Sequence, residues 1–171
     1  SRFRRSEASM APMTRILCPV DFSEASQHAI EHAIVIARWY KASITALHVY
    51  NPAFVPIPGL PALESRIPEA ELKRMQVETN RCFKDAVASG VDVDVIVDVG
   101  QPAAQILKRS DAAHSDLIVM GTHGAGGFEH LLLGSVTEKV LRRAHCPVLT
   151  VPPHAQATST LPFRRLLCAV D

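Results

Sequence analysis

Residues 120–146 read MGTHGAGGFEHLLLGSVTEKVLRRAHC, and the rest of the chain is arranged around them. The short apolar run 116–120 stops at Gly121, four more glycines follow, and Ser135 then opens a helical pattern. A strand, a glycine-rich loop and a helix start in this order bring backbone amides and a positive helix end together. Glycine suits such a loop because it adopts positive φ without strain. We therefore predict a loop that cradles phosphates.

The start of the helix after this loop has its own signal. Ser135 and Glu138 have the S-x-x-E spacing of a capping box, in which the serine is the N-cap and the glutamate reaches back to it. The pattern predicts a helix that begins at Ser135 and presents its first-turn amides to the loop.

Composition sets the broad class. The 171 residues are 47% apolar and 20% charged, which is typical of a globular protein and excludes a disordered one. A formal net charge of +1 gives no electrostatic case for nucleic acid or a membrane surface as partner. No apolar run approaches the ~20 residues that span a bilayer. The four cysteines form no C-x-x-C pair, and the N-terminal residues lack a secretory pattern, so a cytoplasmic setting is expected.

Apolar runs and helix signals alternate along the chain. The predicted strands are residues 15–20, 43–50, 91–99, 116–120 and 147–151, and the predicted helices are 24–41, 69–89, 103–114 and 135–145. Ser23 is the expected N-cap of the first helix, and Pro68 and Gly90 are expected at the two ends of the second. Strands that alternate with helices predict a mainly parallel sheet covered on both faces. The alternation VDVDVIVDV at 91–99 is typical of a strand at a sheet edge.

The chain ends suggest a domain organisation. We expect residues 1–13 to be a disordered or expression-derived tail, 14–152 one domain, and 153–162 a linker. Residues 163–171 (FRRLLCAVD) repeat the pattern of 13–21 (MTRILCPVD) at an offset of 150 residues. Chance similarity of two apolar strands is the simpler explanation, but it does not readily give both the cysteine and the final aspartate. We interpret 163–171 as the first strand of a truncated second repeat.

The spacing Gly121-x2-Gly124-x9-Gly134-Ser135 resembles the nucleotide-binding signature of the universal stress protein family. The segments LCPVDFS (17–23), LHV (47–49) and CPVLTV (146–151) are also similar to that family. The resemblance covers roughly residues 14–152. It implies an α/β fold with an open five-stranded parallel sheet of order 3-2-1-4-5 and helices on both faces, the Rossmann-like arrangement of the adenine nucleotide alpha hydrolases.

The resemblance also implies a site where the winding of the sheet reverses. ATP is the implied ligand, with ADP and AMP as alternatives and Mg²⁺ on the phosphates; no catalytic residue and no protein-held metal are implied. The implied nucleotide contacts are Asp21 and Val49 at the adenine and ribose, Met120 beside the base, Gly121, His123 and Gly124 along the ribose and phosphates, and Gly134, Ser135, Val136 and Thr137 on the phosphate oxygens. A homodimer paired through the fifth strand, residues 147–151, is also implied.

His123 departs from the family pattern, in which a basic residue often stands at this position. An imidazole neutralises less phosphate charge than arginine, and no Lys or Arg lies between Gly121 and Ser135. We therefore expect binding that weakens without Mg²⁺ and tightens as the pH falls towards 6.

Plainer readings and other functions remain open at this point. Asp21 and Ser135 each suit a helix cap without any ligand, and His28 with His32 most simply represent two surface histidines rather than a zinc pair. The first function is an ATP-holding regulatory module of the stress response. The second is a weak ATPase or phosphotransferase, against which stands the absence of a G-x4-G-K-[ST] motif. The third is a dimerisation or chaperone-like module without nucleotide.

Overall fold

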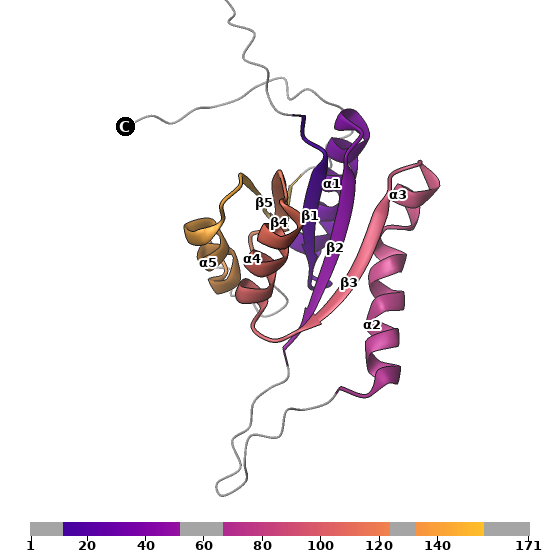
Figure 1. Cartoon of the computed structure of the whole chain (residues 1–171), viewed down its shortest axis with the longest axis vertical. Helices are drawn as coiled ribbons and strands as arrows, with labels where there is room; N and C mark the ends of the chain where they lie inside the picture. Colours follow the sequence, from indigo (N-terminus) through magenta and orange to yellow (C-terminus); the bar gives the residue numbers. More distant parts are fainter. Residues whose placement is uncertain (1–11, 52–66, 124–132, 156–171) are drawn as a thin grey trace, which may run out of the picture.

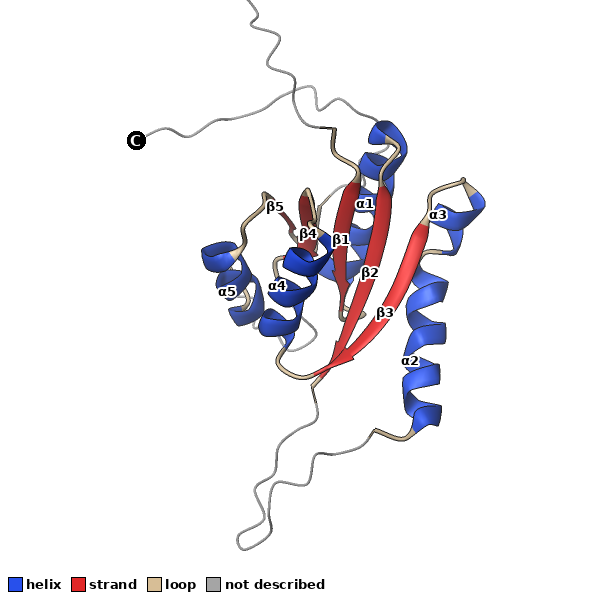
Figure 2. Cartoon of the chain, viewed as in Figure 1, coloured by secondary structure: helices blue, strands red, loops and turns tan. Residues whose placement is uncertain are grey.

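The computed structural model describes residues 12–51, 67–123 and 133–155, in which strands alternate with helices except where α2 is followed directly by α3 (Figures 1 and 2). The strands are β1 (Arg15–Val20), β2 (Ser43–Tyr50), β3 (Val93–Val99), β4 (Leu117–Gly121) and β5 (Val148–Val151). The helices are α1 (Glu24–Tyr40), α2 (Glu69–Cys82), α3 (Lys84–Ala88), α4 (Pro102–Ala113) and α5 (Ser135–Arg143). The expected linker and the repeat-like segment 163–171 lie largely or wholly outside the described residues.

The strands form one parallel sheet of order β3-β2-β1-β4-β5, which confirms the expected fold and the edge position of β3. The central strand β1 pairs with β2 from Arg15↔Ser43 to Val20↔His48. On its other side β1 pairs with β4 at Ile16↔Leu117 and Leu17↔Ile118. The chain therefore leaves β1 on one side towards β2 and β3 and returns on the other side as β4 and β5.

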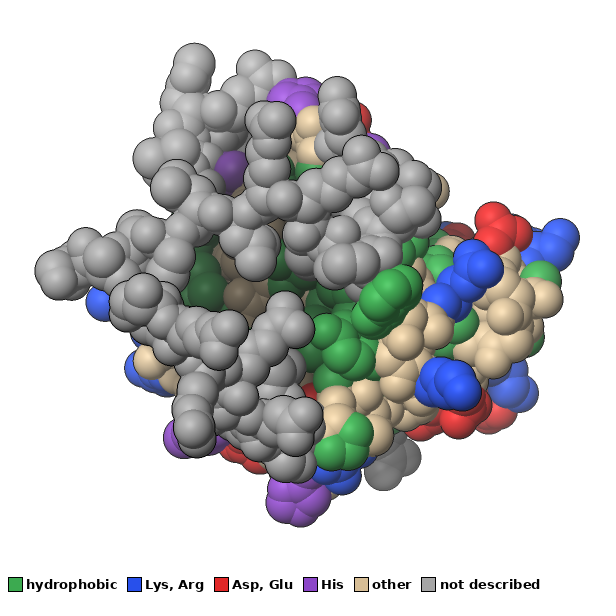
Figure 3. Space-filling model, turned by 90° about the horizontal axis from the view of Figure 1, so that it is seen from above, with side chains coloured by type: hydrophobic (Ala, Val, Ile, Leu, Met, Phe, Trp, Pro, Cys, Tyr) green, Lys and Arg blue, Asp and Glu red, His purple; other side chains and the backbone are tan. Residues whose placement is uncertain are grey.

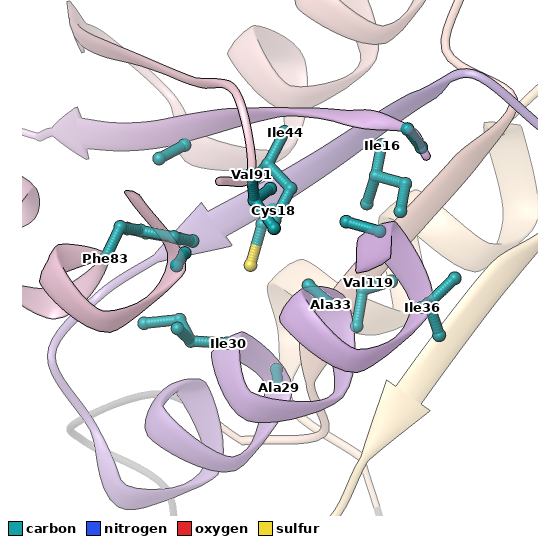
Figure 4. Packing of buried hydrophobic residues seen from close by; sticks show 14 of the residues in the cluster. Ile16, Cys18, Ala29, Ile30, Ala33, Ile36, Ile44, Phe83, Val91 and Val119 are labelled. Atoms are coloured by element: carbon teal, nitrogen blue, oxygen red, sulfur yellow. The ribbon is translucent and has the colours of Figure 1, made fainter. Parts of the chain in front are cut away.

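Two hydrophobic clusters lie on the two faces of the sheet. One joins β1, β2 and β4 to α1, α3 and the residue between α2 and α3, and includes Cys18, Ile30, Ile44 and Phe83 (Figure 4). The other joins the opposite face to α4 and α5 through Leu17, Leu47, Ile106, Met120 and Val140. Alternate residues of β1 thus serve different clusters, because successive side chains of a strand point to opposite faces.

Cys18 belongs to the first cluster, where its thiol is packed as a small apolar group. Burial raises the pKa of its thiol, and Cys82 nearby adds to the rise. The described cysteines are all free thiols. Cys18 is therefore inert rather than reactive, since the nucleophilic form of cysteine is the thiolate.

The second predicted helix, 69–89, is wrong as a single element, because the structure breaks it at Phe83. This residue has φ −107° and ψ 11°, and its N–H donates to the Asn80 carbonyl three residues back at 3.1 Å. The Phe83 side chain is completely buried (Figure 4). The tighter local turn redirects the chain where this ring enters the core. Gly90, at φ +83°, ends α3 as expected.

The described surface carries charges of both signs. Figure 3 shows Lys and Arg intermingled with Asp and Glu on one face, as expected from a net charge of +1. Among the described helices, none has the length and apolar character that crossing a bilayer requires.

Candidate functional site

The candidate site lies at the carboxyl ends of β1 and β4, where the sheet order reverses. Asp21 directly follows β1, and Gly121 is the last residue of β4. Because β1 and β4 are parallel neighbours, the turns that follow them lie at the same edge of the sheet. The sequence-predicted residues from the two halves of the chain are therefore brought to one region.

The turn after β1 is held by the Asp21 side chain. Its Oδ1 accepts hydrogen bonds from the Ser23 N–H at 3.0 Å and the Ser23 hydroxyl at 2.6 Å. Ser23 is the N-cap of α1, as predicted, since its Oγ accepts from the Ser26 N–H at 3.1 Å. The Asp21 N–H in turn donates to Ser26 Oγ at 3.3 Å. Asp21 does cap this turn, and its Oδ2 has no hydrogen-bond partner among the described residues.

Phe22 sits between these residues in a left-handed conformation. Its φ of 63° costs a non-glycine residue about 1–3 kcal/mol. Its ring packs on the imidazole of His48 with centroids 4.7 Å apart and planes tilted by 37°. Such an aromatic contact contributes ~0.5–1.5 kcal/mol, which offsets part of the strain. The sequence analysis did not predict this pair. The only indication in the sequence was an aromatic residue directly after Asp21.

Gly121 has a packing role that the sequence did not reveal. A Cβ at this position would lie 2.9 Å from both the carbonyl carbon and the Cβ of Ala25, and 3.0 Å from the Ser26 nitrogen. The backbone of β4 therefore touches the first turn of α1 directly. This contact requires glycine here whether or not a ligand binds.

The start of α5 is tied to the end of β4 by two hydrogen bonds. The Thr137 hydroxyl donates to the Gly121 carbonyl at 2.9 Å, and the Gly134 N–H donates to the Thr122 carbonyl at 2.7 Å. Thr137 is only 3% exposed. Its hydroxyl thus serves to join strand and helix, which leaves its amide as the group able to meet a phosphate.

The predicted capping box is wrong. The N-cap of α5 is Gly134, with φ −74° and ψ 151°, and it makes no side-chain cap hydrogen bond. Ser135 is the first helical residue, with an exposed side chain. Glu138 pairs instead with Arg142 at 2.9 Å, one turn further along the helix. The shift by one residue leaves the Ser135 hydroxyl outside the cap, at the same end of α5 as the first-turn amides.

His123 is joined to both halves of the site. Its Nδ1 lies 2.9 Å from the Thr122 hydroxyl, and its carbonyl lies 3.4 Å from Ser23 Oγ. The Thr122 N–H donates to the Val151 carbonyl at 2.9 Å, which extends the β4–β5 ladder past Gly121. Thr122 is a further residue that sequence reasoning missed. Its only signal was its place directly after a buried strand.

The apolar residues among the predicted nucleotide contacts lie on one face of the sheet. Met120 is 4% exposed and belongs to the cluster beneath α4 and α5, against which Val49 is partly buried. Val136 packs against the same cluster from α5. Gly124 lies outside the described residues. The apolar contacts thus lie on the face of the sheet that α5 covers.

The histidine pair on α1 is not a pair of surface residues, so that expectation is wrong for one of them. His32 is 9% exposed, and its Nδ1 donates to the His28 carbonyl at 2.8 Å. His28 lies 3.3 Å from a Glu31 carboxylate oxygen. No cluster of three or more metal-binding side chains occurs in the described part of the chain.

Comparison with known proteins gives a consistent result. The sequence profile of the universal stress protein family matches residues 13–152. Universal stress protein MJ0531 of Methanocaldococcus jannaschii is 40% identical over 139 residues, which are 80% of this chain and 81% of that protein.

Solved structures agree with this match. Universal stress protein UspA from Lactobacillus plantarum has a TM-score of 0.72 at 28% identity, covering 83% of this chain and 99% of its own. A universal stress protein in complex with cAMP has a TM-score of 0.61 at 26% identity, covering 84% of this chain and 99% of its own.

Proposed function

The chain belongs to the universal stress protein family, and on this basis we propose that it is an ATP-binding regulatory module of the stress response rather than a fast catalyst. One observation carries the proposal. The first turn of α5 is fastened to the end of β4 by the bonds from Thr137 to Gly121 and from Gly134 to Thr122, beside the turn that holds Asp21.

This arrangement suits a phosphate group. The first amides of a helix have no intrahelical partner, and the helix dipole places partial positive charge on them. Fastening that end to the sheet fixes the amides before a ligand arrives, so less entropy is lost on binding. The amides of Ser135, Val136 and Thr137, together with the Ser135 hydroxyl and Gly134, are our proposed phosphate contacts.

The nucleoside would occupy the other half of the site. Asp21 Oδ2 is an acceptor suited to a ribose hydroxyl. The partly buried Val49 offers apolar surface for a base, and the buried Met120 would flank the base from the cluster beneath. Gly121, His123 and Gly124 would line the path between ribose and phosphates. The similarity to a universal stress protein in complex with cAMP supports an adenine nucleotide as the ligand class.

Mg²⁺ would arrive with the phosphates. Magnesium keeps several waters and binds phosphate oxygens with one or two carboxylates, so it does not need a dedicated protein cage. No Lys or Arg lies between Gly121 and Ser135, so the cation would balance charge that the loop leaves unbalanced.

The proposal is tested by identifying the nucleotide released when freshly purified protein is denatured, and by the thermal shift with ATP and Mg²⁺. We expect an adenine nucleotide and a rise in the thermal midpoint. Gly124→Leu should abolish the shift, whereas Gly90→Asn, on the far side of the domain, should keep it. Absence of both nucleotide and shift would instead favour a dimerisation module without ligand.

The enzyme alternative is distinguished by rate. A held triphosphate with Mg²⁺ hydrolyses slowly if water reaches it, so a low rate is compatible with a binding module. Turnover well above ~1 per second, the low end of ordinary enzyme rates, would overturn the proposal.

A further inference from the structure

The least expected residue of the candidate site is Phe22. It is 44% exposed, adopts φ 63°, and lies between Asp21 and the N-cap of α1. Glycine and asparagine are the residues that tolerate this conformation best. A bulky aromatic residue in such a position is an outlier whose surroundings must hold it in place.

His48 supplies that support from the neighbouring strand. Its Nδ1 lies 2.8 Å from the Val20 carbonyl oxygen, and because a carbonyl only accepts, Nδ1 carries the proton and donates. This bond links β2 to the last residue of β1 by a side chain, in addition to the ladder that pairs Val20 with His48. The imidazole fixed in this way forms the surface on which the Phe22 ring packs at 4.7 Å.

The same turn sets the direction of the Asp21 carboxylate. Two bonds from Ser23 hold Oδ1, and the bond to Ser26 Oγ holds the Asp21 N–H. Phe22 is the one residue between Asp21 and Ser23, so its backbone angles determine whether these bonds form together. The contact between the Phe22 and His48 rings fixes those angles from outside the turn.

We propose that Phe22 and His48 are positioning residues that aim the Asp21 carboxylate at the ribose of the bound nucleotide. The inference rests on the proposed function, because it concerns how one of its contacts is oriented. Phe22 acts through Asp21, so its contribution to binding disappears when the carboxylate is removed.

The test uses the full chain with Phe22→Asn, Phe22→Tyr, His48→Gln, Asp21→Ala and the double variant Phe22→Asn with Asp21→Ala. Asparagine tolerates the left-handed conformation without offering a ring, and tyrosine keeps the ring. Affinity for ATP with Mg²⁺ is measured by calorimetry. Hydrogen exchange of the Ser23 amide, which donates to Asp21, is measured by NMR without nucleotide.

Phe22→Asn should weaken ATP binding by on the order of tenfold, the loss of one hydrogen bond to a charged group. Its Ser23 amide should exchange faster. His48→Gln should reproduce both effects if Phe22→Asn does not fold. Phe22→Tyr should keep the affinity and the Ser23 exchange rate close to those of the unaltered chain. In the Asp21→Ala background, Phe22→Asn should cause no further loss.

Unchanged affinity and unchanged Ser23 exchange in Phe22→Asn would overturn the proposal. An equal loss with and without the Asp21 carboxylate would also overturn it, since Phe22 would then touch the ligand itself. If the unaltered chain binds no nucleotide, the proposed function fails, and the Ser23 amide alone decides whether the ring pair positions Asp21.

Discussion

At the scale of single residues, Gly121 shows how a ligand signature and a packing requirement coincide. Gly121→Ala would place a methyl group 2.9 Å from the backbone of Ala25, which cannot move aside as a flexible side chain would. We expect a loss of about 1–3 kcal/mol in the free energy of unfolding, a typical cost of overpacking. The thermal midpoint should fall by roughly 3–10 °C.

Gly90→Asn is the matched control for this substitution. Gly90 has positive φ, but a Cβ there meets nothing within 4 Å, and asparagine tolerates the conformation. Its thermal midpoint should change little. A Gly121→Ala protein as stable as the unaltered chain would mean that α1 can withdraw from β4 at no cost.

Asp116 makes the stability of the fold depend on pH at low pH. Its Oδ2 accepts from the Thr14 N–H at 2.8 Å, the Thr14 hydroxyl at 3.0 Å and the Arg15 N–H at 2.9 Å. The Thr14 N–H is the largest cause of a lowered pKa for this carboxyl; burial opposes it, while the Arg15 N–H and the Thr14 hydroxyl add to it.

A lowered pKa in the folded state means that Asp116 stabilises the fold fully above its unfolded value, near pH 4, and loses this effect as the pH falls through the folded value. Asp116→Asn should therefore cost about 1 kcal/mol at pH 7, a modest figure because the carboxylate is partly exposed to solvent. The two proteins should converge in stability below pH 4 in urea titrations. A constant difference between pH 7 and pH 3 would contradict this account.

At the scale of elements, α5 is capped differently from what its sequence predicts. The S-x-x-E pattern predicts Ser135 as N-cap, and removal of a serine N-cap costs ~1 kcal/mol. The structure places Gly134 there, and Ser135 makes no cap bond. We therefore expect Ser135→Ala to leave the thermal midpoint without nucleotide nearly unchanged while weakening ATP binding. Ser23→Ala, which removes an observed N-cap, is the comparison and should lower the midpoint.

The sequence predicts the elements well wherever local signals and packing agree. The apolar runs predict all five strands, and the sequence predicts the starts of α1, α2, α4 and α5 to within one residue. The break at Phe83 could not be predicted, because its cause is a tertiary contact: a ring that the core buries completely. The cap of α5 was predicted wrongly for a similar reason, since the bond from Gly134 to Thr122 helps to place Gly134, not Ser135, at the N-cap.

The candidate site also contains residues that the sequence predicts and contacts that it does not predict. Glycines and Asp21 stand out in the sequence because their positions after strands are unusual. The contact between Phe22 and His48 joins the turn after β1 to β2, and the hydrogen bond from Thr137 to Gly121 joins α5 to β4. Neither follows from spacing along the chain. The buried His32 was also hidden, because its polar atom is satisfied by a backbone carbonyl.

At the scale of the whole molecule, the two edges of the sheet differ in how well they are protected against pairing with another chain. The edge strand β3 carries Asp94 and Asp98, and Asp98 pairs with Arg109 of α4 with both N–O distances at 2.5 Å. Charged side chains on an edge strand discourage pairing with another chain. The opposite edge strand β5 reads Val-Leu-Thr-Val and carries no charge. If copies of this chain associate through a sheet edge, β5 is therefore the edge to expect.

The expected homodimer through β5 can be tested without disturbing β4. The carbonyls of Pro147 and Val151 accept from Ile118 and Thr122, so by alternation the backbone groups of Val148 and Thr150 point away from β4. Thr150→Pro removes one outward N–H and should turn the dimer into a monomer by light scattering at micromolar concentration. Thr150→Val keeps that N–H and should remain dimeric. A monomeric unaltered chain would refute the dimer, whereas a folded Thr150→Pro dimer would move the interface to another surface.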